Sequence, residues 1–388
     1  MATAEMGKTL KSALAEVDKC AALFRHLAQV GPDMLAPSSI PLAAGGRAEM
    51  HWLPLGPVLA VMPWNFPYWQ GALFLTPTTM AGNVGLLKHA GNVQGVAALI
   101  QRMVDEAGAP DGVFQNLPIR SGPVGAIIAD DRVAAVTLTG SEAAGQAVAE
   151  QAGRALKKVV LELGGSDPFI VMPSADLDDA VAKAVTARIQ NTGQSCICGK
   201  RMIVHEAIYD DFRDRFVAAM AAVKAGDPLD PASDMGPLSS EEQRRTVQEQ
   251  VWKMKAAGAT LTGGEALGGP GAYMTAGVLE GVPVDRDLMA EEIFGPIAML
   301  FRATDVDEAL SIANAIPFGL GSSVWTRDSA EQDRFVRDIA AGMTAINQVM
   351  ASAPEAPFGG IKRSGHGREL GAAGLHEFMN LKTVLRAE

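Results

Sequence analysis

The hydrophobic pattern near the start of the chain predicts one helix followed by two short strands. Residues 8–29 carry apolar side chains every three or four positions, which predicts an amphipathic helix. From Arg47 to Trp52 polar and apolar residues alternate, which is the period of a strand. Gly56-Pro57 then leads into the apolar run Val58–Val61. We expect these two strands to form a hairpin with one polar side, outside the central core.

After Pro67 the pattern becomes a repeated alternation of strands and helices, which indicates a parallel α/β sheet. A second region of the same kind runs from about residue 168 to 347, and Thr383–Leu385 is expected to be an edge strand. The first region predicts strands at 84–88, 112–116, 134–139 and 159–163, with helices at 93–106, 122–130 and 142–156. The second predicts helices near 176–190, 207–225, 239–257, 305–315 and 329–340.

Length and composition narrow the class of protein. A chain of 388 residues with 48% hydrophobic residues suits two or three domains. The formal net charge of -11 argues against nucleic acid or an anionic membrane as a main partner. Three cysteines cannot form a disulfide framework and indicate a reducing compartment. Without a signal-peptide pattern or a long apolar run, we expect a cytoplasmic protein.

Two reactive side chains stand in informative contexts. Cys196 follows Gly-Gln-Ser, and Glu162 is the single carboxylate of an otherwise apolar strand. A thiol and a carboxylate of this kind fit a nucleophile and a general base for acyl chemistry, and burial would raise the pKa of the carboxylate towards a useful range. The alternatives are an inert buried cysteine and a carboxylate that pairs with a lysine or caps a loop.

Three further features suggest polar ligands. Asn65 is held between residues that restrict the backbone, in Pro-Trp-Asn-Phe-Pro, although it could also be a turn-forming asparagine. Gly140-Ser141 lies at a strand-to-helix junction, where free N–H groups favour a pyrophosphate and where an ordinary helix cap is the alternative. Lys88 ends a strand, a position where parallel sheets bind ligands, unless it is a surface lysine.

Five segments in this order give the chain a family resemblance that covers nearly all of it. It resembles the aldehyde dehydrogenase superfamily, and most closely the bacterial succinic semialdehyde dehydrogenase-like enzymes. The segments are Pro-Trp-Asn-Phe-Pro (63–67), Leu-Glu-Leu-Gly-Gly-Ser-Asp-Pro-Phe (161–169), Gln-Asn-Thr-Gly-Gln-Ser-Cys (190–196), Glu-Glu-Ile-Phe-Gly-Pro (291–296) and Pro-Phe-Gly-Gly (357–360).

The resemblance implies NAD(P)-dependent oxidation of an aldehyde, with succinic semialdehyde as one candidate, to a carboxylic acid through a cysteine thioester. Cys196 would be the nucleophile. Glu162 would activate the water that hydrolyses the thioester, which argues for a free acid product. Asn65 and the Cys196 backbone N–H would hold the oxyanion.

The resemblance also implies the architecture and the assembly. The expected fold is α/β, with a parallel-sheet cofactor-binding domain, an α/β catalytic domain and a small β arm for oligomerisation. Self-association to a dimer or tetramer is expected, because such strands expose edges that another subunit can pair. The implied division is an NAD(P)-binding domain at 1–42 and 58–165, a catalytic domain at 166–358, oligomerisation strands at 43–57 and 378–388, and a returning segment at 359–377.

The implied cofactor is NADP or NAD. Strongly NAD-selective relatives carry a glutamate three residues after Lys88, where this chain has Gly91. A 2′-phosphate would therefore meet no like charge there, and we expect NADP to be accepted. Phe294 has core packing as its alternative role. The implied cofactor-binding residues are Pro63, Trp64, Lys88, Gly140, Ser141, Leu163, Glu292 and Phe294.

The substrate signal is less complete than the cofactor signal. Many relatives carry an arginine on the helix after Trp-Asn-Phe-Pro, where this chain has Gly71-Ala72-Leu73, and a second arginine position is Gln190 here. Arg188, unless it is a surface helix residue, and Ser352 remain as candidate contacts for a substrate carboxylate. Trp69 would make the substrate entrance more apolar.

Cys198 forms Cys-x-Cys with the candidate nucleophile. It is either a redox partner of Cys196 or a small packing residue, and no metal site is expected because no histidine cluster accompanies it.

Two other functions stay open at this level. Relatives usually carry a longer N-terminal segment, so a shortened homologue, weakly active or inactive, with a binding or assembly role is one alternative. A cysteine hydrolase or esterase is the other, but it would need a base on the thiol and would leave the cofactor elements without purpose.

Overall fold

The chain folds into two compact units, each built on a mainly parallel sheet. The structure, a computed structural model, describes residues 1–387, and for Arg286 it describes the backbone alone. The first unit comprises Met1–Leu14, Leu163–Ala351 and Gly359–Gly365, and the second comprises Ala15–Glu162, Ser352–Phe358 and His366–Glu388.

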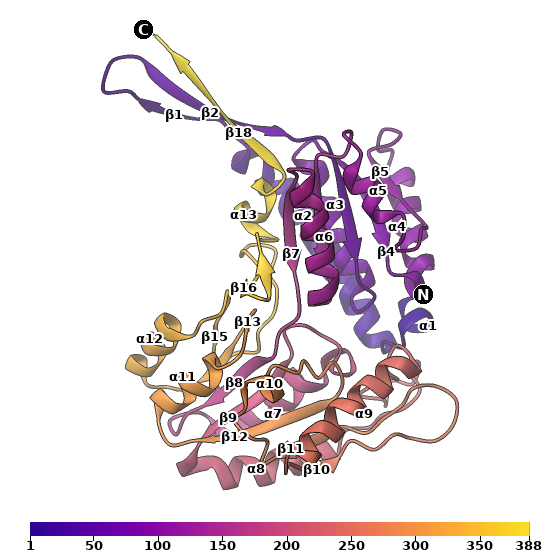
Figure 1. The fold of residues 1–388 in the computed structure, drawn as a ribbon, viewed down its shortest axis with the longest axis vertical. Coiled ribbons are helices and arrows are strands. Elements are labelled where there is room, and N and C mark those ends of the chain that lie inside the picture. Colours follow the sequence, from indigo (N-terminus) through magenta and orange to yellow (C-terminus); the bar gives the residue numbers. More distant parts are fainter. Residues whose placement is uncertain (388) are drawn as a thin grey trace. The chain divides into compact units, whose positions relative to one another are not determined.

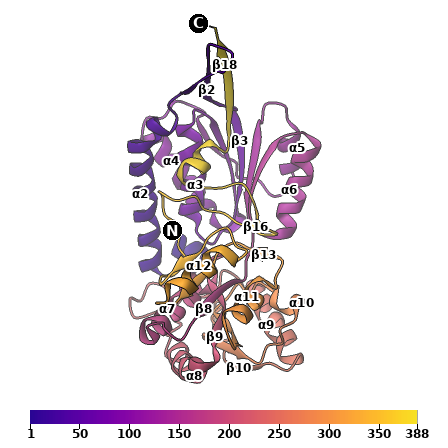
Figure 2. The ribbon, with the colours of Figure 1, turned by 90° about the vertical axis from the view of Figure 1, so that its left-hand side faces the viewer.

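The second unit contains a six-stranded sheet covered by helices on both faces. Figure 2 shows α3 and α4 on one side of the sheet and α5 and α6 on the other. The strand order is β17-β7-β6-β3-β4-β5. The strands are β3 (Pro57–Met62), β4 (Val84–His89), β5 (Phe114–Asn116), β6 (Ala135–Thr139), β7 (Lys158–Glu162) and β17 (Gly365–His366). The helices are α3 (Pro67–Met80), η1 (Gly91–Val93), α4 (Gln94–Glu106), α5 (Val124–Ala129), α6 (Glu142–Arg154) and α13 (Gly371–His376), together with most of α2 (Leu10–Met34).

A three-stranded antiparallel arm projects from the second unit (Figure 1). Its order is β1-β2-β18, with His51 of β2 (Arg47–Pro54) opposite Lys382 of β18 (Met379–Arg386). The predicted terminal strand is confirmed, and it lies at an edge. The sequence did not single out the third member, β1 (Ser38–Pro41).

The predicted hairpin between residues 47–52 and 58–61 is wrong. In the structure these residues belong to β2 and β3. Strand β2 pairs with β1 and β18, whereas β3 pairs in parallel with β4 and β6 at the centre of the six-stranded sheet. The reason is in the side chains. Val58, Leu59 and Ala60 are all buried, and a continuous apolar run is typical of a parallel strand that is covered on both faces.

The first unit is built on a seven-stranded sheet with β10 antiparallel at one edge. Its order is β10-β11-β12-β9-β8-β14-β15. The strands are β8 (Asp167–Val171), β9 (Gly199–His205), β10 (Thr260–Gly263), β11 (Gly277–Glu280), β12 (Ile297–Ala303), β14 (Ser323–Trp325) and β15 (Ala345–Ile346), and β13 (Phe318–Gly319) pairs with β16 (Ile361–Lys362). The helices are α1 (Ala2–Met6), α7 (Leu177–Ile189), η2 (Gln190–Gly193), α8 (Glu206–Ala221), α9 (Glu241–Ala256), α10 (Arg286–Met289), α11 (Val306–Asn314) and α12 (Ser329–Asp338).

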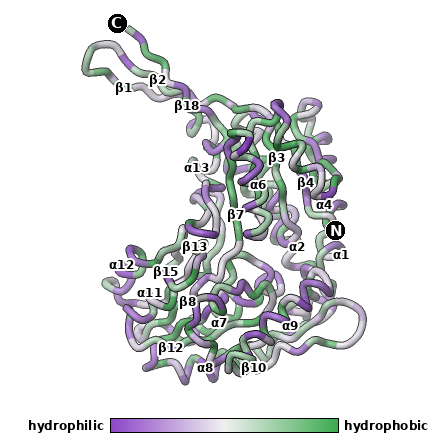
Figure 3. The backbone as a smooth tube through the Cα atoms, in the orientation of Figure 1, coloured by the Kyte–Doolittle hydropathy of each residue, from purple (hydrophilic) through white to green (hydrophobic). Residues whose placement is uncertain are grey.

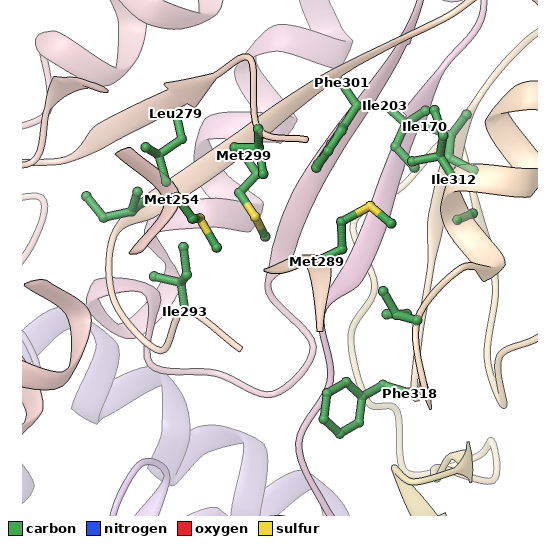
Figure 4. Packing of buried hydrophobic residues seen from close by; sticks show 14 of the residues in the cluster. Ile170, Ile203, Met254, Leu279, Met289, Ile293, Met299, Phe301, Ile312 and Phe318 are labelled. Atoms are coloured by element: carbon green, nitrogen blue, oxygen red, sulfur yellow. The ribbon is translucent and has the colours of Figure 1, made fainter. Parts of the chain in front are cut away.

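Apolar side chains from this sheet and its helices form the core of the first unit. Figure 3 shows hydrophobic residues gathered along the strands. In the cluster of Figure 4, Ile293 packs beside Met254 of α9 and Met299 of β12. Ile293 is fully buried, so it anchors the segment that carries Glu292 and Phe294.

Among the described residues, no helix has both the length and the apolar character needed to cross a membrane. Within the same residues, no group of three or more metal-ligating side chains is found.

Candidate active site

Cys196 lies in a tight turn of the first unit, between η2 and β9. Three consecutive residues before it, Asn191, Thr192 and Gly193, have φ values of 52°, 57° and 73°. A Cβ at Gly193 would lie 2.3 Å from the Gly295 carbonyl oxygen, so only glycine fits there. The Cys198 N–H then closes the turn on the Ser195 carbonyl at 3.3 Å. The strained backbone leaves Cys196 partly exposed.

Arg188, at the end of α7, fixes this turn from inside the unit. Its Nη2 donates to the carbonyls of Gly193 at 2.8 Å and Gly295 at 2.7 Å. The side chain is fully buried, so the reading of Arg188 as a surface residue is wrong. To reach a substrate carboxylate, the Arg188 guanidinium would have to leave these carbonyls.

Lys200, on β9, is a buried cation beside the nucleophile that the sequence did not single out. Its Nζ donates to the carbonyl oxygens of Ser195 at 3.0 Å and Cys196 at 2.7 Å. It lies 3.0 Å from Glu292 Oε1. Burial raises the pKa of the nearby Asp167 carboxyl to about 6, an effect that the charge of Lys200 partly offsets. A fully buried ammonium is thus balanced by carboxylates and carbonyls.

Glu292 is placed so that its carboxylate could accept a hydrogen bond from a hydroxyl group of a ligand. Its Oε1 is buried and forms an ion pair with Lys200 at 3.0 Å, and no hydrogen bond to it is found among the described residues. Gly164 makes room for this carboxylate, since a Cβ there would lie 2.2 Å from Oε2. A cavity of about 450 Å³ opens beside Glu292, lined also by Phe318 and Arg363. Phe294 is half-buried. These features fit the ribose of a dinucleotide.

Glu162 ends β7 in the second unit and is buried without a hydrogen-bond donor. Neither carboxylate oxygen has a hydrogen-bond partner among the described residues, so the expected alternative, pairing with a lysine, is not what the structure has. Burial raises the pKa of Glu162 well above its ordinary value, and the charge of Glu369 raises it further, while Arg368 lowers it. A carboxyl of this kind suits a general base near neutral pH.

Glu369 is a second buried carboxyl of the same unit, and the sequence did not predict it. Burial raises its pKa to about 7. Its backbone exchanges hydrogen bonds with Phe358, at 2.7 and 2.8 Å. The charge of Glu369 raises the pKa of Glu162, so the two carboxyls lie near each other.

Asn65 is buried just before α3. Pro67 occupies the first turn of that helix, where its fixed φ is compatible with a helix start. Pro63 and Trp64, which precede Asn65, are half-buried. Pro63 and Pro67 restrict the backbone on either side of Asn65, and the oxyanion role of its amide stays a prediction.

The candidate cofactor residues of the second unit lie at or just after the ends of β3, β4 and β6. Ser141 caps α6, with its Oγ accepting from the Ala144 N–H at 3.3 Å. The Gly140 N–H donates to the Glu162 carbonyl at 2.9 Å. Lys88 is half-buried, and burial lowers the pKa of its ammonium. The carboxyl edge of a parallel sheet is a usual place for a nucleotide.

Leu163, which belongs to the first unit, is buried, and its N–H donates to the Ser364 carbonyl at 2.9 Å. Leu163 directly follows Glu162, so its backbone is fixed beside the candidate base.

Two of the candidate substrate residues contact one lysine. Lys19 of α2 donates from Nζ to Ser352 Oγ at 2.6 Å. The same Nζ lies 4.2 Å from the centroid of the Trp69 ring, within the range of a cation–π contact. Trp69 itself is buried, and its backbone N–H donates to Glu16 Oε1 at 2.9 Å. Lys19 is thus a cation at the candidate substrate residues that the sequence did not reveal.

Cys198 is buried, and its Sγ contacts the Gln190 carbonyl at 3.6 Å. None of the three cysteines, all of which lie in the described part of the chain, forms a disulfide. The contact suits a packing residue, and the redox role of Cys198 stays a prediction.

The model of one protein family, described as the aldehyde dehydrogenase family, matches residues 1–384. The chain belongs to the aldehyde dehydrogenase family. It is 55% identical over 387 residues to the succinate-semialdehyde dehydrogenase (NADP+) 1 of Mycobacterium tuberculosis, covering 99% of this chain and 85% of the relative. It is 56% identical to the succinate-semialdehyde dehydrogenase (NADP+) of Mycobacterium avium, covering 99% and 82%.

Solved structures of aldehyde dehydrogenases share the fold. The succinic semialdehyde dehydrogenase of Streptococcus pyogenes, in complex with NADP+, superposes with a TM-score of 0.97 at 37% identity, covering 100% of this chain and 85% of that one. The α/β fold with parallel sheets, predicted from the sequence, is confirmed.

Proposed function

We propose that this aldehyde dehydrogenase oxidises succinic semialdehyde, or a similar short semialdehyde, to the free acid with NADP. The observation that carries the acid product is Glu162, a buried carboxyl with no hydrogen-bond donor and a raised pKa. Such a carboxyl makes no hydrogen bond that would stabilise the fold, but it can act as a base that takes a proton from water. The curated relatives described above act, by their names, on the same semialdehyde with NADP+.

The reaction would begin at Cys196, whose thiolate attacks the aldehyde carbon. A C–S bond forms, and the carbonyl π pair moves to oxygen, where the Asn65 amide and the Cys196 N–H donate hydrogen bonds. NADP, when bound, would supply the hydride acceptor, so that the C–H bond of the former aldehyde carbon breaks and the oxygen pair re-forms the carbonyl. The product on Cys196 is then a thioester. Glu162 removes a proton from water, the oxygen attacks the thioester, and the C–S bond breaks to release the acid and the thiolate.

The chain's own groups would position the cofactor. We propose that Glu292 Oε1 accepts a hydrogen bond from a hydroxyl of the nicotinamide ribose and that Phe294 packs against the nicotinamide ring. Lys88 and the start of the helix at Gly140-Ser141 would bind the adenosine half of the cofactor. Pro63, Trp64 and Leu163 complete the proposed set.

Cofactor choice can be tested at Gly91, the first residue of η1. A Cβ there meets no atom within 4 Å, so a side chain enters without a clash. Gly91→Glu should raise the Kd for NADP at least about tenfold while changing the Kd for NAD about twofold, because it places a carboxylate beside the expected 2′-phosphate. Fluorescence titration of both cofactors measures this. Gly91→Ala is the uncharged control, and an equal loss of both cofactors in Gly91→Glu would show that residue 91 does not face the ribose.

Lys19 supports a substrate that carries a carboxylate. Where many relatives have an arginine, this chain has Leu73, so a cation must come from elsewhere. The Lys19 ammonium contacts both Ser352 and Trp69. A charged hydrogen bond between a lysine and a carboxylate contributes about 1.5–3 kcal/mol. We propose that Lys19 binds the far end of the semialdehyde, with Ser352 as its partner.

An aldehyde panel with both cofactors tests the proposed function. Succinic semialdehyde with NADP should give the highest kcat/KM, well above that of butanal, which has the same carbon count without the carboxylate. Lys19→Met should raise the KM for succinic semialdehyde roughly 10- to 100-fold and leave butanal unchanged. Lys11→Met, an exposed lysine of the same helix, is the control. An equal effect on both aldehydes would remove Lys19 from carboxylate binding.

We also propose that the chain self-associates to a dimer or tetramer through the arm, because β1 and β18 are the two outer strands of the arm. We further propose a cytoplasmic location. The domain boundaries given above stay a prediction.

A further inference from the structure

Lys200 is bound to the very peptide that the proposed mechanism uses to hold the oxyanion. The Cys196 N–H belongs to the peptide group whose carbonyl oxygen is that of Ser195. Lys200 Nζ donates to this oxygen at 3.0 Å, and to the next carbonyl, that of Cys196, at 2.7 Å. A cation on a peptide oxygen draws electron density from the group and makes its N–H a better donor.

The surroundings of Lys200 show that this arrangement is maintained at a cost. Its side chain is fully buried, and removing an ammonium from water costs several kcal/mol unless charges and hydrogen bonds compensate. Glu292 supplies a carboxylate at 3.0 Å, and Asp167 a second negative charge nearby. A long apolar side chain could fill the same space without that cost. We therefore infer a functional role for the positive charge of Lys200.

We propose that Lys200 is a positioning residue that polarises the Ser195–Cys196 peptide and so strengthens the oxyanion-hole N–H. Its effect appears when the aldehyde oxygen becomes negative, as the C–S bond forms and the carbonyl pair moves to oxygen. Glu292 holds the ammonium beside this peptide through the ion pair at 3.0 Å. The inference rests on the proposed function, because it takes Cys196 as the nucleophile.

Two reactions of the same thiol separate this role from a structural one. Aldehyde oxidation passes through an oxyanion. Alkylation by iodoacetamide does not, because the thiolate displaces iodide from a saturated carbon. Lys200→Met should lower kcat roughly 10- to 100-fold, part of the effect of losing a whole oxyanion donor. The limiting alkylation rate at high pH, where the thiol is fully ionised, should stay within about twofold of the parent protein.

Further variants of Lys200 separate the effect of its charge from that of its hydrogen bonds. Lys200→Arg keeps the charge and should recover most of kcat. Lys200→Gln keeps N–H donors, in its NH2 group, without the charge and should recover little. Lys200→Gln also replaces Lys200→Met if the latter does not fold. Lys253→Met is the matched control, because Lys253 pairs with the adjacent carboxylate, Glu291, at 2.6 Å, outside the nucleophile turn. It should match the parent protein in both reactions.

The inference is overturned if the Lys200 variants match the parent protein, or if oxidation and limiting alkylation fall together, which would mean that Lys200 only maintains the fold of the turn. A parent protein that oxidises no aldehyde in the panel would instead refute the proposed function. The two failures are thus distinguishable.

Discussion

Replacing Cys196 with alanine should lower aldehyde oxidation by roughly 10⁴-fold or more, because no other group in the proposed mechanism can form the thioester. The folded protein should still bind NADP with nearly the parent Kd, since the ribose-binding carboxylate Glu292 and the strand-end residue Lys88 are unchanged. Steady-state absorbance of reduced cofactor measures the first effect, and fluorescence titration measures the second.

Cys198→Ala provides the control for this substitution. It removes a thiol two residues away that is buried against the Gln190 carbonyl, and it should keep turnover within a few-fold of the parent protein. Oxidation that survives in Cys196→Ala would reject the nucleophile, and oxidation lost equally in both variants would mean that the turn, rather than the thiol of Cys196, had been damaged.

Replacing Glu162 with glutamine should separate the two halves of the reaction. The first turnover should release reduced cofactor at nearly the parent rate, and steady-state turnover should then fall roughly 10²- to 10⁴-fold, because the amide cannot take a proton from water. Stopped-flow absorbance would show a burst followed by a slow phase. If the burst disappears with the steady state, Glu162 acts before the thioester forms.

The raised pKa of Glu162 also predicts the pH dependence. Only the ionised carboxylate can act as the base, and burial with the nearby charge of Glu369 raises the pKa. Thioester hydrolysis should therefore increase with pH over a range above the ordinary range of a glutamate and then level off. The same limb should be absent from Glu162→Gln. A parent profile that is already level at acidic pH would contradict the buried-base account.

The elements that the sequence predicted well are those whose pattern is local. Helix α4 and strands β4 and β6 were predicted within about two residues, because amphipathic spacing and turn residues mark their ends. Helix α3 gave no such signal. Most of its residues are buried, and a helix that is apolar on all sides has no periodic face to detect.

Pairing was harder to predict than secondary structure. Strand β3 follows β2 in sequence but joins a different sheet. The missing information was long-range, because the partners of β2 include β18, over three hundred residues later. Short loops favour hairpins, but burial of both faces of β3 decided the outcome.

The candidate site divides in the same way. Cys196, Glu162 and Asn65 could be singled out from their motifs, because reactive residues stand out against glycine, proline and apolar neighbours. Lys200 and Lys19 could not. The role of each lysine depends on the residue that it contacts in the fold. Lys200 contacts the Ser195 carbonyl, and Lys19 contacts Ser352, which is far away in the sequence. The Lys200-Arg201 pair inside an otherwise apolar strand was the one local signal, since buried cations require partners.

Mass spectrometry of the trapped intermediate shows which residue carries the acyl group. Glu162→Gln is mixed with succinic semialdehyde and NADP, quenched in acid during the burst, digested and mapped. The account predicts one succinyl group on the peptide containing Cys196, in an amount equal to the burst of reduced cofactor, and none when NADP is omitted. A burst without this adduct, or an adduct on another residue, would contradict it.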